Sequence, residues 1–155
     1  MSTPDRPSHR QGFIDRAPVI RLPHDRLDEP VSWSSRDKRT ASLGEWLASN
    51  TPLVAERFGV TTREPAHTLP VAGDLSEEEA RSVVIARLNR RDLTQGFSDG
   101  ESTSTYGDHL REVVGRTEKG LAVISNELSS IQLLQELAEA GKLAPQPKES
   151  PGIPS

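Results

Sequence analysis

The sequence predicts an all-α protein, in which a short helical module precedes a long C-terminal amphipathic, coiled-coil helix and both tails are disordered. Three observations lead to this fold class. All 12 prolines lie outside residues 71–144, so that span can form long helices. Two helix starts carry the capping-box pattern, a serine followed three residues later by a glutamate. Finally, a heptad pattern of large aliphatic residues runs through the last third of the chain.

Composition limits the remaining possibilities. The 155 residues are 33% hydrophobic and 27% charged, so parts of the chain cannot bury enough apolar surface to fold without a partner. The absence of cysteine excludes disulfides, thiol catalysis and cysteine-ligated zinc. The N-terminus lacks the apolar core of a secretory signal, and no run is apolar enough to cross a bilayer. We therefore expect a cytoplasmic protein with no membrane partner, found in the host cell or the virion if it is viral.

Residues 1–40 are expected to form an extended or disordered docking arm. Short apolar pairs alternate there with charged residues and proline, which is typical of a linear segment that docks on another protein. The stretch APVIRLP at 17–23 could add a strand to a partner, whereas a plain flexible tail is the alternative. The candidate partner-docking residues are Phe13, Ile14, Val19, Ile20 and Trp33.

Residues 41–60 carry the signals of two short helices. Ser42 and Glu45 form a capping box at the start of the first helix. Thr51 can cap the second helix, with Pro52 in its first turn. Together with the next helix along the chain, this pair is expected to build a small core from Trp46, Leu53, Val54, Phe58, Val84 and Leu88.

A loop at 61–75 leads to a capped amphipathic helix at 76–93. Ser76 and Glu79 form its capping box, and its acidic start and arginine-rich end both suit the helix dipole. Residues 94–107 are rich in serine, threonine and glycine and are expected to be a flexible connector.

Residues 108–141 are expected to form one long oligomerising helix. With Leu110 at position d, apolar residues alternate at spacings of four and three over four heptads. Leucine at a and isoleucine at d favour trimers or tetramers over dimers. Gly115, Thr117 and Gly120 weaken the apolar seam. The candidate oligomerisation residues are Leu110, Val114, Leu121, Ile124, Leu128, Ile131, Leu134 and Leu137.

The alternative for this helix is that it packs only on the 76–93 helix of its own chain, which covers about half its length. Residues 142–155, with four prolines in the last eleven residues, are expected to be a disordered tail.

No motif for catalysis stands out. The four histidines have no second ligand at a fixed spacing, and phosphate-binding glycine loops are absent from the sequence. We therefore expect a non-enzyme with no catalytic residues, no cofactor and no metal. The expected function is an oligomeric scaffold or adaptor that tethers a larger complex through its long helix and docking arm, as viral or phage assembly scaffolds and polymerase cofactors do. Its expected partners are copies of itself and one or more unknown proteins that bind the arm. A one-to-one chaperone or inhibitor is an alternative.

The stretch LVAERFGVTT, residues 53–62, resembles the second helix and turn of a helix-turn-helix domain. The resemblance implies a DNA-binding regulator that reads DNA with residues 51–69. The following REPAHTLP departs from the family pattern, because Pro65 and Pro70 would break the recognition helix. The surrounding acidic residues would also repel phosphate, so nucleic acid is not the expected partner.

Overall fold

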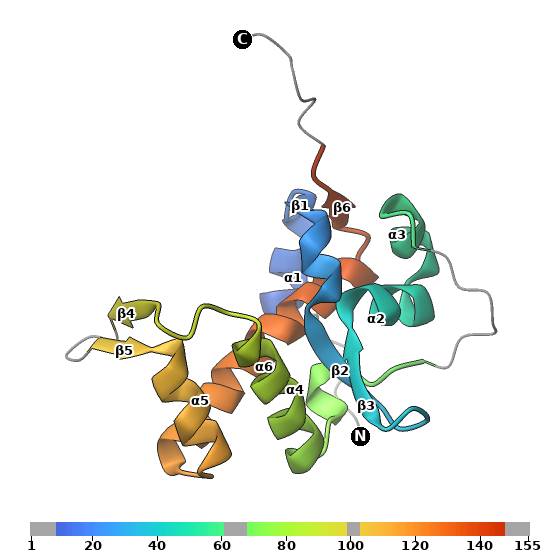
Figure 1. Cartoon of the computed structure of the whole chain (residues 1–155). Helices are drawn as coiled ribbons and strands as arrows, with labels where there is room; N and C mark the ends of the chain where they lie inside the picture. The colour runs from blue at the N-terminus through green and yellow to red at the C-terminus, as the bar shows by residue number, and fades with distance from the viewer. Residues whose placement is uncertain (1–8, 61–67, 99–102, 148–155) are drawn as a thin grey trace, which may run out of the picture.

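A computed structural model describes residues 9–60, 68–98 and 103–147 and has a mixed α/β fold (Figure 1). The predicted all-α class is wrong, because three two-stranded sheets accompany the helices in the described chain. Each strand has only three to five residues. Strands this short give too few alternations of apolar and polar residues to stand out in a sequence.

The N-terminal segment folds against the rest of the chain. Helix α1, His9–Arg16, leads to strand β1, Ile20–Leu22, and a 3-10 helix η1, His24–Asp28. Strand β1 pairs in parallel with β6, Leu143–Pro145, although more than a hundred residues separate them. The prediction of disordered tails is therefore wrong for residues 9–40 and 142–147, while residues 1–8 and 148–155 lie outside the described part.

Two strands and two helices follow. Strands β2, Pro30–Ser34, and β3, Arg39–Ser42, form an antiparallel pair. Helix α2, Leu43–Asn50, begins with both hydrogen bonds of the predicted Ser42–Glu45 capping box. Helix α3, Pro52–Arg57, has Pro52 in its first turn. The capping box uses groups three residues apart, which explains why the sequence predicted it correctly.

The next segment, described from residue 68, is tied to the helices by side-chain amides. Asn50 exchanges two hydrogen bonds with the backbone of Leu69, of 2.8 and 2.9 Å. A short 3-10 helix, η2, spans Ala72–Asp74, and the Ala72 N–H donates to the buried Gln135 side chain at 2.8 Å. The Gln135 side chain therefore satisfies a buried backbone donor.

Helix α4, Glu77–Asn89, starts at the second predicted capping box. The connector that follows contains an antiparallel pair of strands, β4, Gly96–Ser98, and β5, Thr103–Thr105. Residues 99–102 between them lie outside the described part. Strand β5 runs directly into α5, Tyr106–Val114, which Thr105 caps.

The predicted single helix at 108–141 is wrong, because it is split into α5 and α6, Glu118–Glu139. Arg116 adopts a left-handed φ of 60°, which ends the first helix. Thr117 then caps the second helix by accepting from the Gly120 N–H. A Cβ on Gly120 would lie 2.2 Å from the carbonyl oxygen of Glu112, so α6 passes α5 where only glycine fits. Gly115, Thr117 and Gly120, which weaken the apolar seam in the sequence, form or border this corner between α5 and α6.

Helix α6 is long because it serves two hydrophobic clusters of its own chain. Its first half packs Val123 and Ile124 against α4 and α5. Its second half, including Ile131 and Leu137, packs against α1, α2, α3 and the β1–β6 pair. Leu128 contacts both clusters. Figure 1 shows α6 running through the molecule from α5 to β6.

Candidate functional site

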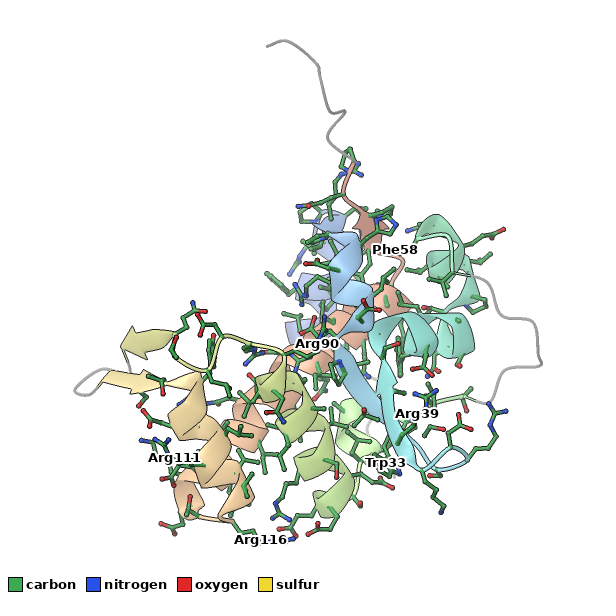
Figure 2. The ribbon with its side chains drawn as sticks, in the orientation of Figure 1. Trp33, Arg39, Phe58, Arg90, Arg111 and Arg116 are labelled. Carbon is green, nitrogen blue, oxygen red and sulfur yellow. The ribbon has the colours of Figure 1, made fainter. Side chains whose placement is uncertain are left out.

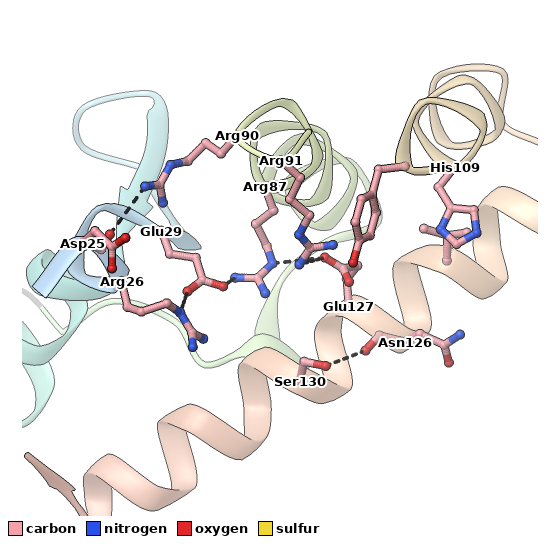
Figure 3. Close-up of a pocket in the computed structure, with 12 residues that line it drawn as sticks. Asp25, Arg26, Glu29, Arg87, Arg90, Arg91, His109, Asn126, Glu127 and Ser130 are labelled. Atoms are coloured by element: carbon pink, nitrogen blue, oxygen red, sulfur yellow. Dashed lines mark hydrogen bonds and ion pairs between the residues drawn. The ribbon is translucent and has the colours of Figure 1, made fainter. Parts of the chain in front are cut away.

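A cleft of about 600 Å³ opens where η1, the end of α4, the start of α5 and the middle of α6 meet (Figure 3). Its size is in the range of small-molecule sites. Its lining is mostly charged or polar. The lining residues are Asp25, Arg26, Glu29, Arg87, Arg90, Arg91, Tyr106, His109, Val123, Asn126, Glu127 and Ser130.

Arg87 lies at the centre of this lining and is 3% exposed. Its guanidinium is 2.7 Å from a Glu29 carboxylate oxygen and 3.3 Å from one of Glu127. It also donates to the Pro30 carbonyl oxygen at 3.0 Å. A buried cation is stable only when paired and hydrogen-bonded, and Arg87 meets both conditions. Through these contacts it joins α4 to β2, to α6 and to the loop before β2.

Two further arginines share the same carboxylates. Arg26 lies 2.5 Å from the second oxygen of Glu29, and Arg91 lies 2.8 Å from the Glu127 oxygen that also meets Arg87. The guanidinium of Arg91 stacks over the Tyr106 ring at 4.9 Å from its centroid. Glu29 therefore uses both oxygens on arginines, and one Glu127 oxygen serves two of them.

Arg90 differs from the other three arginines. Within the described residues it has no carboxylate partner, and its Nη2 donates to the Asp25 carbonyl oxygen at a long 3.4 Å. Figure 3 shows it extending from the end of α4 toward Asp25. Its charge is therefore the least compensated of the four.

The predicted docking residues divide between the core and the surface. Ile14 is fully buried in the monomer, and Trp33 is half-buried. Phe13, 63% exposed, Val19 and Ile20 point their apolar side chains to solvent. Phe13, Val19 and Ile20 together form the docking face.

The predicted oligomerisation residues mostly pack inside one chain. Four of the eight are buried in its two clusters: Ile124, Ile131, Leu134 and Leu137. Leu110 and Leu128 are half-buried against the same clusters, while Val114 and Leu121 are exposed. Of the six predicted small-core residues, Leu53 is 76% exposed, and the other five are buried: Trp46, Val54, Phe58, Val84 and Leu88.

Within the predicted DNA-reading segment, 51–69, residues 61–67 lie outside the described part. The described portion of the segment is Thr51, α3, Phe58, Gly59 and Val60, and then Thr68 and Leu69. In the described ranges, no group of three or more histidine, aspartate or glutamate side chains could hold a metal ion. None of the described helices combines the length and low polarity needed to cross a bilayer.

Sequence reasoning missed the arginine cleft, because it assigned the arginines at the end of α4 to the helix dipole alone. A signal was present at Arg87. It follows Val83 by four residues and Val84 by three, which places it on the buried face of the helix. Its carboxylate partners come from segments 40 or more residues away, and no local pattern identifies them.

Comparison with protein-family models, curated proteins and solved structures gives no match for this chain.

Proposed function

We propose that the protein is a non-enzymatic adaptor that binds an extended segment of a partner protein along the outer edge of β1. The observation that carries the proposal is the docking face. Its three apolar side chains are exposed to solvent, although Ile14 and Leu22 in the same segment are buried. Exposed apolar groups gathered in one short stretch are typical of interaction sites.

The backbone of β1 offers hydrogen bonds to such a segment. Ile20 donates to Lys142, and the Leu22 carbonyl accepts from Gln146, so these two residues direct their backbone groups toward β6. Bonding groups alternate along a strand, and those of Arg21 therefore face the opposite side. In the described chain β1 pairs with β6 alone, which leaves that side without a strand. A peptide strand added there would use the edge as β-augmentation does.

The charges beside β1 indicate what kind of segment fits. Arg16 and Arg21 are both exposed. A partner segment with apolar residues facing the docking face and acidic residues beside them would complement this surface.

The proposal of a non-enzyme has its own support. A carboxylate acts as a general base only when it is free to take a proton from substrate, whereas both oxygens of Glu29 and one of Glu127 are paired with arginines. In the cleft these carboxylates hold cations in place. The trimer or tetramer expected from the heptad seam stays a prediction, and molar mass by light scattering tests it.

The experiment is a selection from a displayed library of random peptides on the immobilised full chain. Enriched peptides are then titrated against three variants. Arg21→Pro removes the outward N–H, and proline is tolerated on a strand edge that faces solvent. Phe13→Ser removes an apolar side chain of the docking face. Leu53→Ser is the matched control, because it removes another well-exposed apolar side chain, on α3.

We expect enriched peptides to be apolar with acidic flanks, and to lose binding to Arg21→Pro and Phe13→Ser but not to Leu53→Ser. Peptides that bind Arg21→Pro as well as the wild type would show that the strand edge is not used. A selection that enriches no peptide would refute the adaptor proposal.

A further inference from the structure

We propose that the arginine cleft binds a small molecule carrying a phosphate monoester, with Arg26, Arg90 and Arg91 as its anion-binding residues. This inference is independent of the docking face, because the cleft lies between η1, α4, α5 and α6 while the docking face belongs to α1 and β1.

The first support is the charge balance. The lining carries four arginines and three acids, Asp25, Glu29 and Glu127, which leaves one positive charge in excess. Glu29 and Glu127 pair with Arg26, Arg87 and Arg91, and Arg90 has no carboxylate partner among the described residues. The third acid of the lining, Asp25, contacts Arg90 through its backbone carbonyl. A phosphate monoester carries between one and two negative charges near neutral pH and would offset this excess.

The second support is the balance of hydrogen-bond donors and acceptors. An arginine has five N–H donors, and within the described residues Arg26, Arg90 and Arg91 each contact a single acceptor. Both oxygens of Glu29 and one of Glu127 are already paired with arginines, so the cleft has more unused donors than acceptors. Phosphate, with three terminal oxygens, accepts several guanidinium bonds at once, whereas a carboxylate has two.

The third support is the rigidity and access of the donors. Arg26 and Arg91 are partly exposed, with side chains 39% and 27% accessible, yet each is held by a carboxylate that fixes its position. Preorganised donors of this kind lose little entropy on binding. The amide of Asn126 and the hydroxyl of Ser130 line the opposite side and suit a polar body attached to the phosphate.

A small phosphate fits better than a nucleic acid. The chain as a whole carries a net charge of −4, so a polyanion would meet repulsion outside the cleft. A single phosphate group would enter the cationic cleft without that repulsion.

The experiment is a calorimetric titration of the full chain with glycerol 3-phosphate, adenosine monophosphate, inorganic phosphate, succinate and a duplex oligonucleotide. The main variant is Arg90→Gln, because its long bond to a carbonyl contributes little to folding. Arg111→Gln is the matched control, since it removes the same charge from an exposed site on α5 outside the cleft lining (Figure 2).

We expect saturable one-to-one binding of at least one phosphate ester, weakened roughly tenfold by Arg90→Gln and unchanged by Arg111→Gln. Equal binding by the wild type and Arg90→Gln would overturn the proposal, as would the absence of saturable binding to any phosphate probe. Preference for succinate would assign the cleft to carboxylates, and tighter binding of the oligonucleotide would assign it to nucleic acid. Either of these results would refute the phosphate ester.

Discussion

Replacing Gly120 with alanine tests the corner between α5 and α6 directly. The Cβ added to Gly120 would lie 2.2 Å from the Glu112 carbonyl oxygen, 2.7 Å from its carbonyl carbon and 3.0 Å from the Val113 nitrogen. All three atoms belong to the backbone of α5, so no side chain can rotate to make room. The two helices must move apart, or the corner at Arg116 must shift.

The expected magnitude follows from two opposing effects. Alanine is favoured over glycine in a helix by about 1 kcal/mol. Overpacking against a fixed backbone costs typically about 1–3 kcal/mol, occasionally more, and the 2.2 Å approach is severe. We therefore expect Gly120→Ala to lower the free energy of unfolding by about 1–2 kcal/mol. In one continuous helix the same change would raise it, so the two folds differ in the sign of the effect.

The assay is equilibrium urea denaturation followed by far-ultraviolet circular dichroism. Gly73→Ala is the matched control, because a Cβ there meets no atom within 4 Å. It should be neutral or should raise the stability by a few tenths of a kcal/mol, through the lower entropy of its unfolded chain. A Gly120→Ala protein as stable as the wild type, or more stable, would refute the close crossing of α5 and α6.

Four further substitutions test the cores, the cleft and the capping box. Ile131→Ala should lower the free energy of unfolding by about 2–5 kcal/mol, because the Ile131 side chain is fully buried. Leu121→Ala should change it by less than about 0.5 kcal/mol, because the Leu121 side chain is half exposed. Similar losses for the two variants in urea denaturation would contradict the two-cluster core. Arg87→Met should lower the free energy of unfolding by about 3 kcal/mol, since it removes a buried cation from two carboxylates that are only 13% and 15% exposed. A loss under about 1 kcal/mol in the same assay would show that the network is not needed for folding. The hydrogen bond from Arg39 lowers the pKa of Glu45 below its ordinary 4.5, so its contribution is present above that pH and lost as the pH falls through the folded-state value. Wild type should therefore exceed Glu45→Gln in stability near neutral pH by less than about 1 kcal/mol, and this difference should shrink as the pH falls below 4.5. A difference that is constant with pH would contradict the ion pair.

Much of the local structure could be predicted from the sequence. The Ser42 and Ser76 capping boxes form as expected, because each depends on a serine and a glutamate three residues apart. Five of the six expected small-core residues are buried as well. Leu53 is the exception, because on the short helix α3 it faces away from the side that packs, and its hydrophobicity alone does not tell which side that is.

The split between α5 and α6 was only partly visible. Gly115, Thr117 and Gly120 read as weak points of one helix, and each is also compatible with a helix end followed by a cap. The heptad pattern continued across them and favoured a single helix. Whether one helix or two form depends on whether another part of the same chain covers the apolar face. A periodic pattern shows that a helix has an apolar face but does not show what packs against it.

The sequence by itself determined where α2 and α4 begin and which aliphatic residues are available to be buried, because these depend on groups a few residues apart. Only the tertiary structure decided the rest. The pairing of β1 with β6 places Ile20 beside Leu143. In the cleft, Arg87 contacts Glu29, which precedes it in the sequence, and Glu127, which follows it. Such contacts form when segments distant in the sequence come together and pair their backbone groups and charges. The spacing of neighbouring residues in the sequence does not show which distant segments will pair.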